Sequence, residues 1–298
     1  NNPSFLRYNL RMLISKDWKE YQLLDSGKGQ KLEQFGPHRL VRPEPRAVWK
    51  KAWGEEEWQS AVASFIAAEK GGGGRWEFHK KFDHQWKLNY KALNFWVEVE
   101  ASKQIGVFPE NAVHWDWIGE QITKSKGPLK ILNLFGYTGL ASLAAANAGA
   151  EVTHVDSSKR AVRIGKENQE LSGLGSAKIR WIVDDVLKFI QREARRGNTY
   201  DGVIMDPPKY GLGPNKERWE FFKQYAVLCA QIHEILSDTP KFVVITAYAL
   251  ESPPEVLAED MERMMRRMGG SFDYGELITE EKSAGRRLSN SIYARWQK

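Results

Sequence analysis

The sequence predicts an α/β fold, a mostly parallel sheet with helices on both faces, preceded by an aromatic-rich domain built largely of β-hairpins. Three observations carry this prediction. Beyond residue 127, apolar strand-like runs alternate regularly with helical patterns, and the first of these runs ends in a glycine turn. Nine of the twelve tryptophans lie within the first 117 residues, so the two parts of the chain differ in kind.

The alternation beyond residue 127 is typical of successive βαβ units, whose crossovers place helices on both faces of a parallel sheet. We expect strands at 129–135, 151–155, 178–183, 202–206 and 241–249, and helices at 138–149, 158–172, 185–196, 217–236 and 254–269. The last two strand-like segments, Phe272–Ile278 and Asn290–Gln297, have no helix between them. We place the domain border at Gly127-Pro128, which divides the chain into 1–127 and 128–298.

The first domain contains short strand-like runs that are separated by turn residues, a pattern that predicts hairpins. One hairpin is expected from Tyr21–Leu24 and Phe35–Val41, with the turn Asp25–Gly29 between them. A second is expected within Trp76–Glu100, where apolar and polar residues often alternate. The segment Glu55–Lys70 has an apolar face at helical spacing, so we expect a helix there.

Composition narrows the class of protein. The 298 residues carry a net charge of +6, which permits an anionic partner such as RNA without demanding one. No apolar run approaches the ~18 residues that a membrane span needs, so no membrane partner is expected. One cysteine excludes a disulfide framework and favours a cytoplasmic location, and the six histidines lack metal-ligand spacing, so no metal is expected. The chain starts at Asn1 without a leader pattern, so we expect no signal peptide and a trimmed start.

The first glycine turn, Asn133-Leu-Phe-Gly-Tyr-Thr-Gly139, follows the first predicted strand and opens a helix of small residues. Gly136 and Gly139 can let a ligand approach the backbone closely, and Thr138 can cap the helix. Asp156 stands 20 residues beyond Gly136, at the end of the next strand, where such folds hydrogen-bond ribose hydroxyls. A lone Gly-x-x-Gly is weak evidence, and its spacing differs from the Gly-x-Gly-x-x-Gly of nicotinamide enzymes, so the turn and Asp156 alone indicate any nucleoside cofactor.

A pair of aspartates ends the third predicted strand. Asp185 is placed to accept the amine of an adenine ring, with Val186 against the ring. Asp184 takes that role if the register shifts by one residue. Capping of the following helix is the structural alternative for both carboxylates.

The segment Asp206-Pro-Pro-Lys-Tyr210 ends the fourth predicted strand. Two prolines remove amide donors and leave backbone carbonyls free to accept hydrogen bonds from an amine, and Asp206 supplies a further acceptor. Tyr210 can stack on a base, and Lys209 can contact a phosphate or the polar edge of a substrate. A strand-ending turn whose tyrosine only packs is the alternative.

Together these motifs resemble a known group. Gly106-Val-Phe-Pro-Glu110, the glycine turn, Asp156-Ser157, Asn168, Asp184-Asp-Val186 and Asp206-Pro-Pro-Lys-Tyr210 are similar to the bacterial large-subunit ribosomal-RNA (cytosine carbon-5) methyltransferases. The resemblance implies a Rossmann-like class I fold with an antiparallel last strand, S-adenosylmethionine as cofactor and an RNA substrate. It implies Asp206, Pro207, Lys209 and Tyr210 as catalytic residues. It implies that the cofactor is bound by Asn133, Phe135, Gly136, Tyr137, Thr138, Gly139, Asp156, Ser157, Asp185, Val186 and Asp206.

One departure bears on the chemistry. Methylation of cytosine carbon 5 requires a thiolate, which in the resembling enzymes follows the fifth strand, but Val244–Leu250 contains no cysteine. Cys229 lies in a predicted apolar helix, where a buried structural role is favoured. We therefore expect direct in-line methyl transfer to a nitrogen or oxygen of a planar base. Two alternatives stay open: a methyltransferase of a small molecule or protein, and a non-catalytic nucleoside- or RNA-binding module.

Three further expectations concern single residues. Glu110 and Trp115 could close over the methyl donor, or could pack at the domain junction. His154, within the second strand, is expected to be a core or sheet-edge residue. Arg286 and Arg287 are expected in a solvated turn, with phosphate contact as the alternative.

Overall fold

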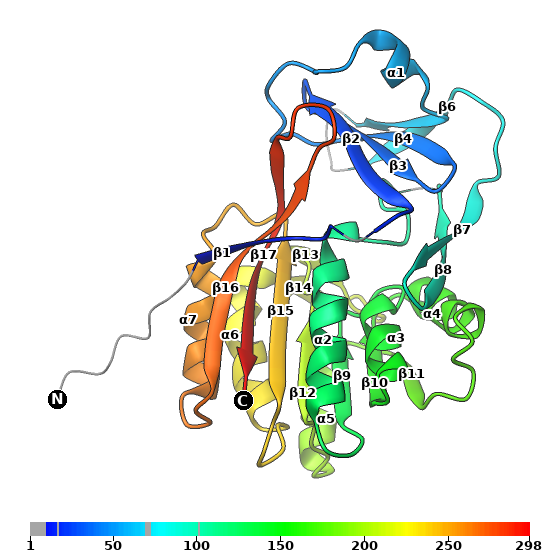
Figure 1. The fold of residues 1–298 in the computed structure, drawn as a ribbon. Coiled ribbons are helices and arrows are strands. Elements are labelled where there is room, and N and C mark those ends of the chain that lie inside the picture. Colours follow the sequence, from blue (N-terminus) through cyan, green and yellow to red (C-terminus); the bar gives the residue numbers. More distant parts are fainter. Residues whose placement is uncertain (1–9, 17, 69–72, 101) are drawn as a thin grey trace.

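The computed structural model describes residues 10–16, 18–68, 73–100 and 102–298. An eight-stranded sheet lies between two layers of helices, and a smaller unit rich in strands lies above its carboxyl edge (Figure 1). The strand order of the large sheet is β1-β16-β17-β15-β12-β9-β10-β11. Among the described residues, no helix is long and apolar enough to cross a membrane.

The five predicted parallel strands are all present. They are β9 (Lys130–Leu134), β10 (Glu151–Asp156), β11 (Ile179–Val183), β12 (Gly202–Met205) and β15 (Phe242–Tyr248). The final hairpin consists of β16 (Ser271–Glu280) and β17 (Arg287–Gln297), and β17 runs antiparallel to β15. These observations confirm the predicted sheet. The parallel pairing of β1 (Leu10–Ile14) with β16 was not predicted.

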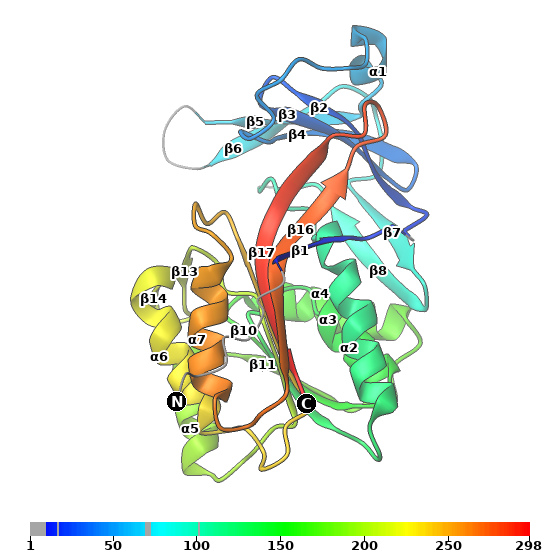
Figure 2. The same cartoon turned by 60° about the vertical axis from the view of Figure 1, so that its left-hand side comes forward.

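The helices cover both faces of the sheet, as predicted (Figure 2). One layer holds α2 (Ala112–Lys124), α3 (Leu140–Asn147) and α4 (Lys159–Leu171), and the other α5 (Val186–Arg195), α6 (Phe221–His233) and α7 (Glu255–Met265). Every residue of β12 is buried, because helices lie over both of its sides. This double burial explains why the strands read as continuous apolar runs.

The smaller unit contains a five-stranded sheet and a separate hairpin. The sheet comprises β2 (Tyr21–Gly27), β3 (Gln30–Phe35), β4 (His38–Pro43), β5 (Ala63–Ala67) and β6 (Gly74–Phe78), and the hairpin comprises β7 (Gln85–Tyr90) and β8 (Leu93–Glu98). The hairpin predicted within Trp76–Glu100 is confirmed by β7 and β8. The first predicted hairpin has other bounds, because β2 continues through Gly27 and pairs with β3, a strand that was not predicted. The helix predicted over 55–70 ends at Gln59, the last residue of α1 (Glu55–Gln59), and the prediction is wrong from Ser60 to Ala68; residues 69 and 70 lie outside the described residues. Pairing of β5 with β4 and β6 overrides the helical pattern.

The two parts of the chain share a core. One buried cluster joins Phe95 of β8 to Trp115 of α2 and to Leu140 and Leu143 of α3. Thus β1 and α2, which precede the border predicted at residue 127, both pack on the large sheet or its helices. The division into 1–127 and 128–298 stays a prediction.

The tip of the β16–β17 hairpin reaches the smaller unit (Figure 1). Arg286 donates to the buried carboxylate of Asp25 at 3.1 Å and also pairs with buried Glu281. Ser283 donates to the same Asp25 oxygen at 2.6 Å. Arg286 is therefore neither in a solvated turn nor placed on phosphate, because it joins the C-terminal hairpin to β2. Arg287 is exposed and pairs with Glu280.

We predict that Arg286→Ala lowers the free energy of unfolding by about 2–4 kcal/mol, because it leaves two buried carboxylates without their cation. Arg287→Ala is the matched control and should cost about 1 kcal/mol or less, since its ion pair is exposed. Urea unfolding of both variants measures the difference. Equal effects of the two substitutions would contradict the role given to Arg286.

Candidate functional site

The turn between β9 and α3 is held in an uncommon backbone conformation. Phe135 and Tyr137 have φ values of 54° and 50°, in the left-handed region that non-glycine residues rarely adopt. The Asp156 carboxylate stabilises the turn, since it accepts hydrogen bonds from the backbone N–H groups of Tyr137 and Ser158, each at 2.8 Å. Burial raises the pKa of Asp156, although these two hydrogen bonds oppose the shift. Each carboxylate oxygen keeps a lone pair for a ligand.

A buried polar network supports the turn from beneath. Asn133 donates to the Ser142 hydroxyl at 2.8 Å, and that hydroxyl contacts His154 Nδ1 at 3.0 Å. His154 is fully buried, as predicted, and burial lowers its pKa to about 3, so it stays neutral. A Cβ on Gly136 would lie 2.4 Å from the His154 ring. The glycine is therefore required by the packing beneath it, whatever the ligand contacts above.

Thr138 and Gly139 have other roles than the sequence predicted. The Thr138 hydroxyl donates to the carbonyl of Gly106 at 2.6 Å, and no side chain caps α3, so the predicted cap is wrong. Gly139 has a φ of 86°, and a Cβ there would lie 2.5 Å from the Trp181 ring. Thr138 thus ties the segment Gly106–Asn111 to the turn, and Gly139 does not line the pocket described next.

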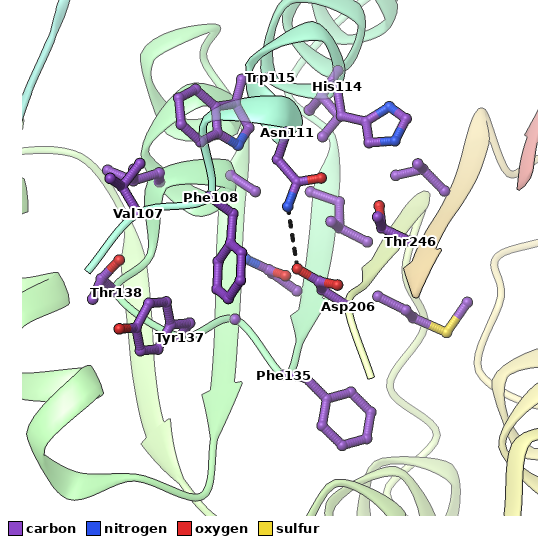
Figure 3. A pocket seen from close by; sticks show the side chains of 18 of the residues that line it. Val107, Phe108, Asn111, His114, Trp115, Phe135, Tyr137, Thr138, Asp206 and Thr246 are labelled. Carbon is purple, nitrogen blue, oxygen red and sulfur yellow. Dashed lines mark hydrogen bonds between the residues drawn. The ribbon is translucent and has the colours of Figure 1, made fainter. Parts of the chain in front are cut away.

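A pocket lies between α2, the β9–α3 turn and the ends of β12 and β15 (Figure 3). Its lining contains predicted site residues, namely Asn133, Phe135, Gly136, Tyr137, Thr138 and Asp206. It also contains Trp115, one of the residues expected to close over a ligand. Among the other lining residues, the polar side chains of Asn111, His114 and Thr246 were not predicted as site residues, and Phe108 was quoted only within the Gly106–Glu110 motif.

Asp206 is the ionisable centre of this pocket. Asn111 Nδ2 donates to one Asp206 oxygen at 3.2 Å, while Asp206 Oδ1 and Asn111 Oδ1 are buried without a partner among the described residues. Burial, reinforced by the charge of Glu110, raises the pKa of Asp206 to about 8. Burial also raises the pKa of Glu110. The pocket therefore presents acceptor atoms that a cationic N–H group would satisfy.

Five predicted cofactor residues lie outside the pocket lining, namely Gly139 and four that follow β10 and β11 or end β10. Asp156 is the last residue of β10 and Ser157 follows it; both residues are half-buried. Asp185 caps α5 by accepting from the backbone N–H of Lys188 at 3.0 Å, which is the structural alternative that its position allowed. Val186 is buried in the core. The contacts of these residues with a cofactor stay predictions. Asp184, the alternative to Asp185, pairs with Arg192.

The double-proline segment leads into a short hairpin that was not predicted, β13 (Tyr210–Leu212) and β14 (Arg218–Glu220). The Trp219 indole donates to the carbonyl of Pro208 at 2.6 Å, so that carbonyl is not free for an amine as expected. The Tyr210 side chain is 66% exposed, which excludes the alternative that it only packs. Pro207 is buried, and Lys209 is half-buried with Nζ 5.9 Å from the centre of the Tyr210 ring.

The thiol of Cys229 is remote from this pocket. Cys229 lies on α6, which packs against α7, and it contributes to the buried core as predicted. Burial raises its pKa to about 12, so it is not a nucleophilic thiolate at neutral pH.

A model of the S-adenosylmethionine-dependent methyltransferase family matches residues 74–267. The chain belongs to this family. The match confirms the prediction of an S-adenosylmethionine-dependent methyltransferase, with S-adenosylmethionine as its cofactor. The crystal structure of the SAM-dependent methyltransferase from Agrobacterium tumefaciens is 44% identical, with 96% of this chain and 93% of that chain covered and a TM-score of 0.92. A methyltransferase complexed with S-adenosylhomocysteine (SAH) is 19% identical at a TM-score of 0.74, over 94% of this chain and 76% of its own, and shares the fold.

Curated relatives match a shorter segment. Ribosomal RNA large subunit methyltransferase I from Klebsiella pneumoniae strain 342 is 38% identical over 82 residues, which are 27% of this chain and 20% of that protein. The protein of the same name from Aeromonas salmonicida strain A449 is 34% identical over 92 residues, which are 30% of this chain and 23% of that protein. The matched segment therefore spans about a fifth of the length of these relatives.

The residues present fit S-adenosylmethionine. The unpartnered acceptors on Asp206 and Asn111 suit its ammonium group and positive sulfur. No lysine or arginine is among the residues that line the described pocket, so nothing there repels the positive charge. The free lone pairs of Asp156 remain available to the ribose.

We predict that the affinity for S-adenosylmethionine rises with pH and levels off near the Asp206 pKa of about 8. A cationic ligand binds the ionised Asp206 carboxylate more tightly than the protonated form, so binding below that pH releases a proton. The affinity for S-adenosylmethionine therefore rises by up to about tenfold per pH unit. Calorimetry between pH 6 and 8 measures the slope. The Asp206→Asn variant should bind weakly with little pH dependence, and an unchanged slope in this variant would contradict the assignment.

The same shift predicts how the stability of the unliganded protein depends on pH. The folded pKa of Asp206, about 8, lies above its ordinary value of 3.8, so the contribution of this group is fully present below pH 4 and is lost as pH rises through 8. Asp206→Asn should therefore raise the melting temperature more at pH 8 than at pH 5. Thermal unfolding of both proteins at the two pH values measures this difference.

Proposed function

We propose that this protein transfers a methyl group from S-adenosylmethionine directly to a nitrogen or oxygen of a planar base in RNA, without a covalent enzyme intermediate. The observation that carries this proposal is the separation of the only thiol from the pocket. Cys229 is buried in α6. In the resembling enzymes the cysteine follows the fifth strand, but here that strand, β15, ends at Tyr248 and contains no cysteine. An acceptor atom with its own lone pair needs no thiolate.

The roles of the individual residues follow from their positions. When bound, S-adenosylmethionine supplies a methyl group on a positively charged sulfur. Asp156 would accept the ribose hydroxyls, and Asp185 with Val186 would contact the adenine, beside the β9–α3 turn. The backbone carbonyls of Asp206 and Pro207 would hold the polar edge of the target base against the methyl group, so that positioning carries most of the catalysis.

Three observations favour RNA as the substrate. The matched curated relatives are ribosomal RNA methyltransferases by name. Exposed apolar side chains stand beside the double-proline segment, since Tyr210 is 66% exposed, Leu212 63% and Phe222 57%. Exposed Lys216 and Arg218 lie in the same segment of the chain, as does exposed Lys223, which pairs with Glu220. Aromatic rings flanked by cations are the usual means of holding single-stranded bases.

The unpaired buried cysteine supports a reducing compartment, the cytoplasm, as the place of action. A small molecule or a protein as substrate, and a binding module without transfer, are the competing functions. Incubation with methyl-labelled S-adenosylmethionine separates all of these functions.

We predict that incubation with methyl-labelled S-adenosylmethionine transfers the label to the RNA pool and not to protein or metabolites. Nucleosides from the labelled RNA should carry the methyl group on nitrogen or oxygen by mass spectrometry, and Cys229→Ser should transfer at the unmutated rate. A 5-methylcytosine product would overturn direct transfer, and label in another pool would overturn RNA as substrate.

We predict that Tyr210→Ala raises the KM for RNA by about 5- to 150-fold, which corresponds to the ~1–3 kcal/mol of one stacked base. Tyr210→Phe keeps the ring and should behave like the unmutated protein. Calorimetric titration with SAH should give the same Kd for all three, because Tyr210 lies outside the pocket lining. An unchanged KM in Tyr210→Ala would refute the stacking role.

A further inference from the structure

His114 lines the pocket, and Arg295, which is outside the lining, forms a buried pair with it. Arg295, on β17, directs two of its guanidinium nitrogens at His114 Nδ1, with Nε at 2.9 Å. The guanidinium stacks over Trp117, 4.7 Å from the ring centre, and over Tyr293 at 5.2 Å. Arginine has donors only, so Nδ1 must supply a lone pair and the proton of the neutral imidazole must lie on Nε2.

That Nε2–H has no partner in the described part of the chain. His114 is 3% exposed, lines the pocket, and its Nε2 is buried without a hydrogen bond. Asn111 is the N-cap of α2 and precedes His114 by three residues. In Figure 3 the Asn111 side chain points at Asp206, and the His114 ring lies beside it on the side of Thr246. A buried donor without a partner is unfavourable, and a ligand acceptor in the pocket would supply the missing hydrogen bond.

The polar atoms of the pocket are arranged for a group that carries both charges. Asp206 Oδ1 and Asn111 Oδ1 are open acceptors, and His114 Nε2–H is an open donor. No lysine or arginine lines the described pocket, so an anionic group has to be bound by neutral donors. The imidazole meets this need, because its other nitrogen accepts from the Arg295 cation, which strengthens Nε2–H as a donor.

We propose that His114 binds the carboxylate of the α-amino-acid end of S-adenosylmethionine, and that Arg295 acts as a positioning residue that fixes the tautomer and orientation of His114. The ammonium of the same end lies against Asp206 and Asn111. This inference rests on the proposed function, since it requires that the methyl donor occupies the pocket. It adds a carboxylate site that contains no cationic side chain. The compensating positive charge is on Arg295, which contacts the site only through His114.

The test compares two ligands that differ in the amino-acid end. SAH carries it, whereas 5′-methylthioadenosine keeps the adenosine and sulfur and lacks it. His114→Phe should weaken SAH binding by about 10- to 100-fold and leave the Kd of 5′-methylthioadenosine unchanged, and His114→Gln, which keeps an N–H donor, should lose less. His233→Gln, on an exposed histidine of α6, is the matched control and should bind both ligands normally.

A second measurement needs no substitution at the pair. In unmutated protein with ¹⁵N-labelled histidine, the His114 ring should report the neutral Nε2–H tautomer, and SAH should shift its Nε2 signal while 5′-methylthioadenosine should not. Failure of the unmutated protein to bind either ligand would overturn the proposed function itself. Binding of SAH with an unshifted His114 signal, or an equal loss of both ligands in His114→Phe, would overturn only the role of His114. If His114→Phe changed only the KM for RNA, the target base and not the carboxylate of the methyl donor would contact His114.

Discussion

The site depends on the Asp156 carboxylate, which holds the β9–α3 turn in its left-handed conformation. Backbone strain of this kind costs about 1–3 kcal/mol per residue and persists only where the surroundings enforce it. Here Asp156 enforces it from β10, and the buried network around His154 supports it from below. One carboxylate therefore positions the backbone and remains available to a nucleoside, so the binding surface is largely formed before any ligand arrives.

The smaller unit contributes directly to this geometry. Thr138 binds the carbonyl of Gly106, and Asn168 accepts from the backbone N–H of Trp96 while it donates to the carbonyl of Thr138. These contacts place Asn111 over Asp206, so the pocket is closed by residues that precede the parallel sheet in sequence. The Arg286 contact with Asp25 joins the last hairpin to the same unit. A movement of the smaller unit would therefore displace residues that line the pocket.

The sequence predicted the parallel sheet, the helices and the final hairpin, because double burial and short connections leave strong periodic signals. It also predicted that Gly136, Tyr137 and Asp206 lie together, since they end neighbouring strands. It could not place Asn111 and His114, because their importance arises from how α2 crosses the sheet edge. The helix expected over 55–70 failed for a related reason: strand pairing with distant partners outweighed a local pattern. Tertiary contacts also gave Thr138 and Arg286 roles that no local rule indicates.

The central claim is that a sulfonium nucleoside binds across the carboxyl edge of β9, β10 and β12. A crystal structure of the protein in complex with SAH tests it most directly. The account predicts ribose hydroxyls on the Asp156 carboxylate and the amino-acid end in the pocket beside Asn111 and Asp206. Density for the ligand at any other place, or a pocket that stays closed while SAH binds, would contradict the account.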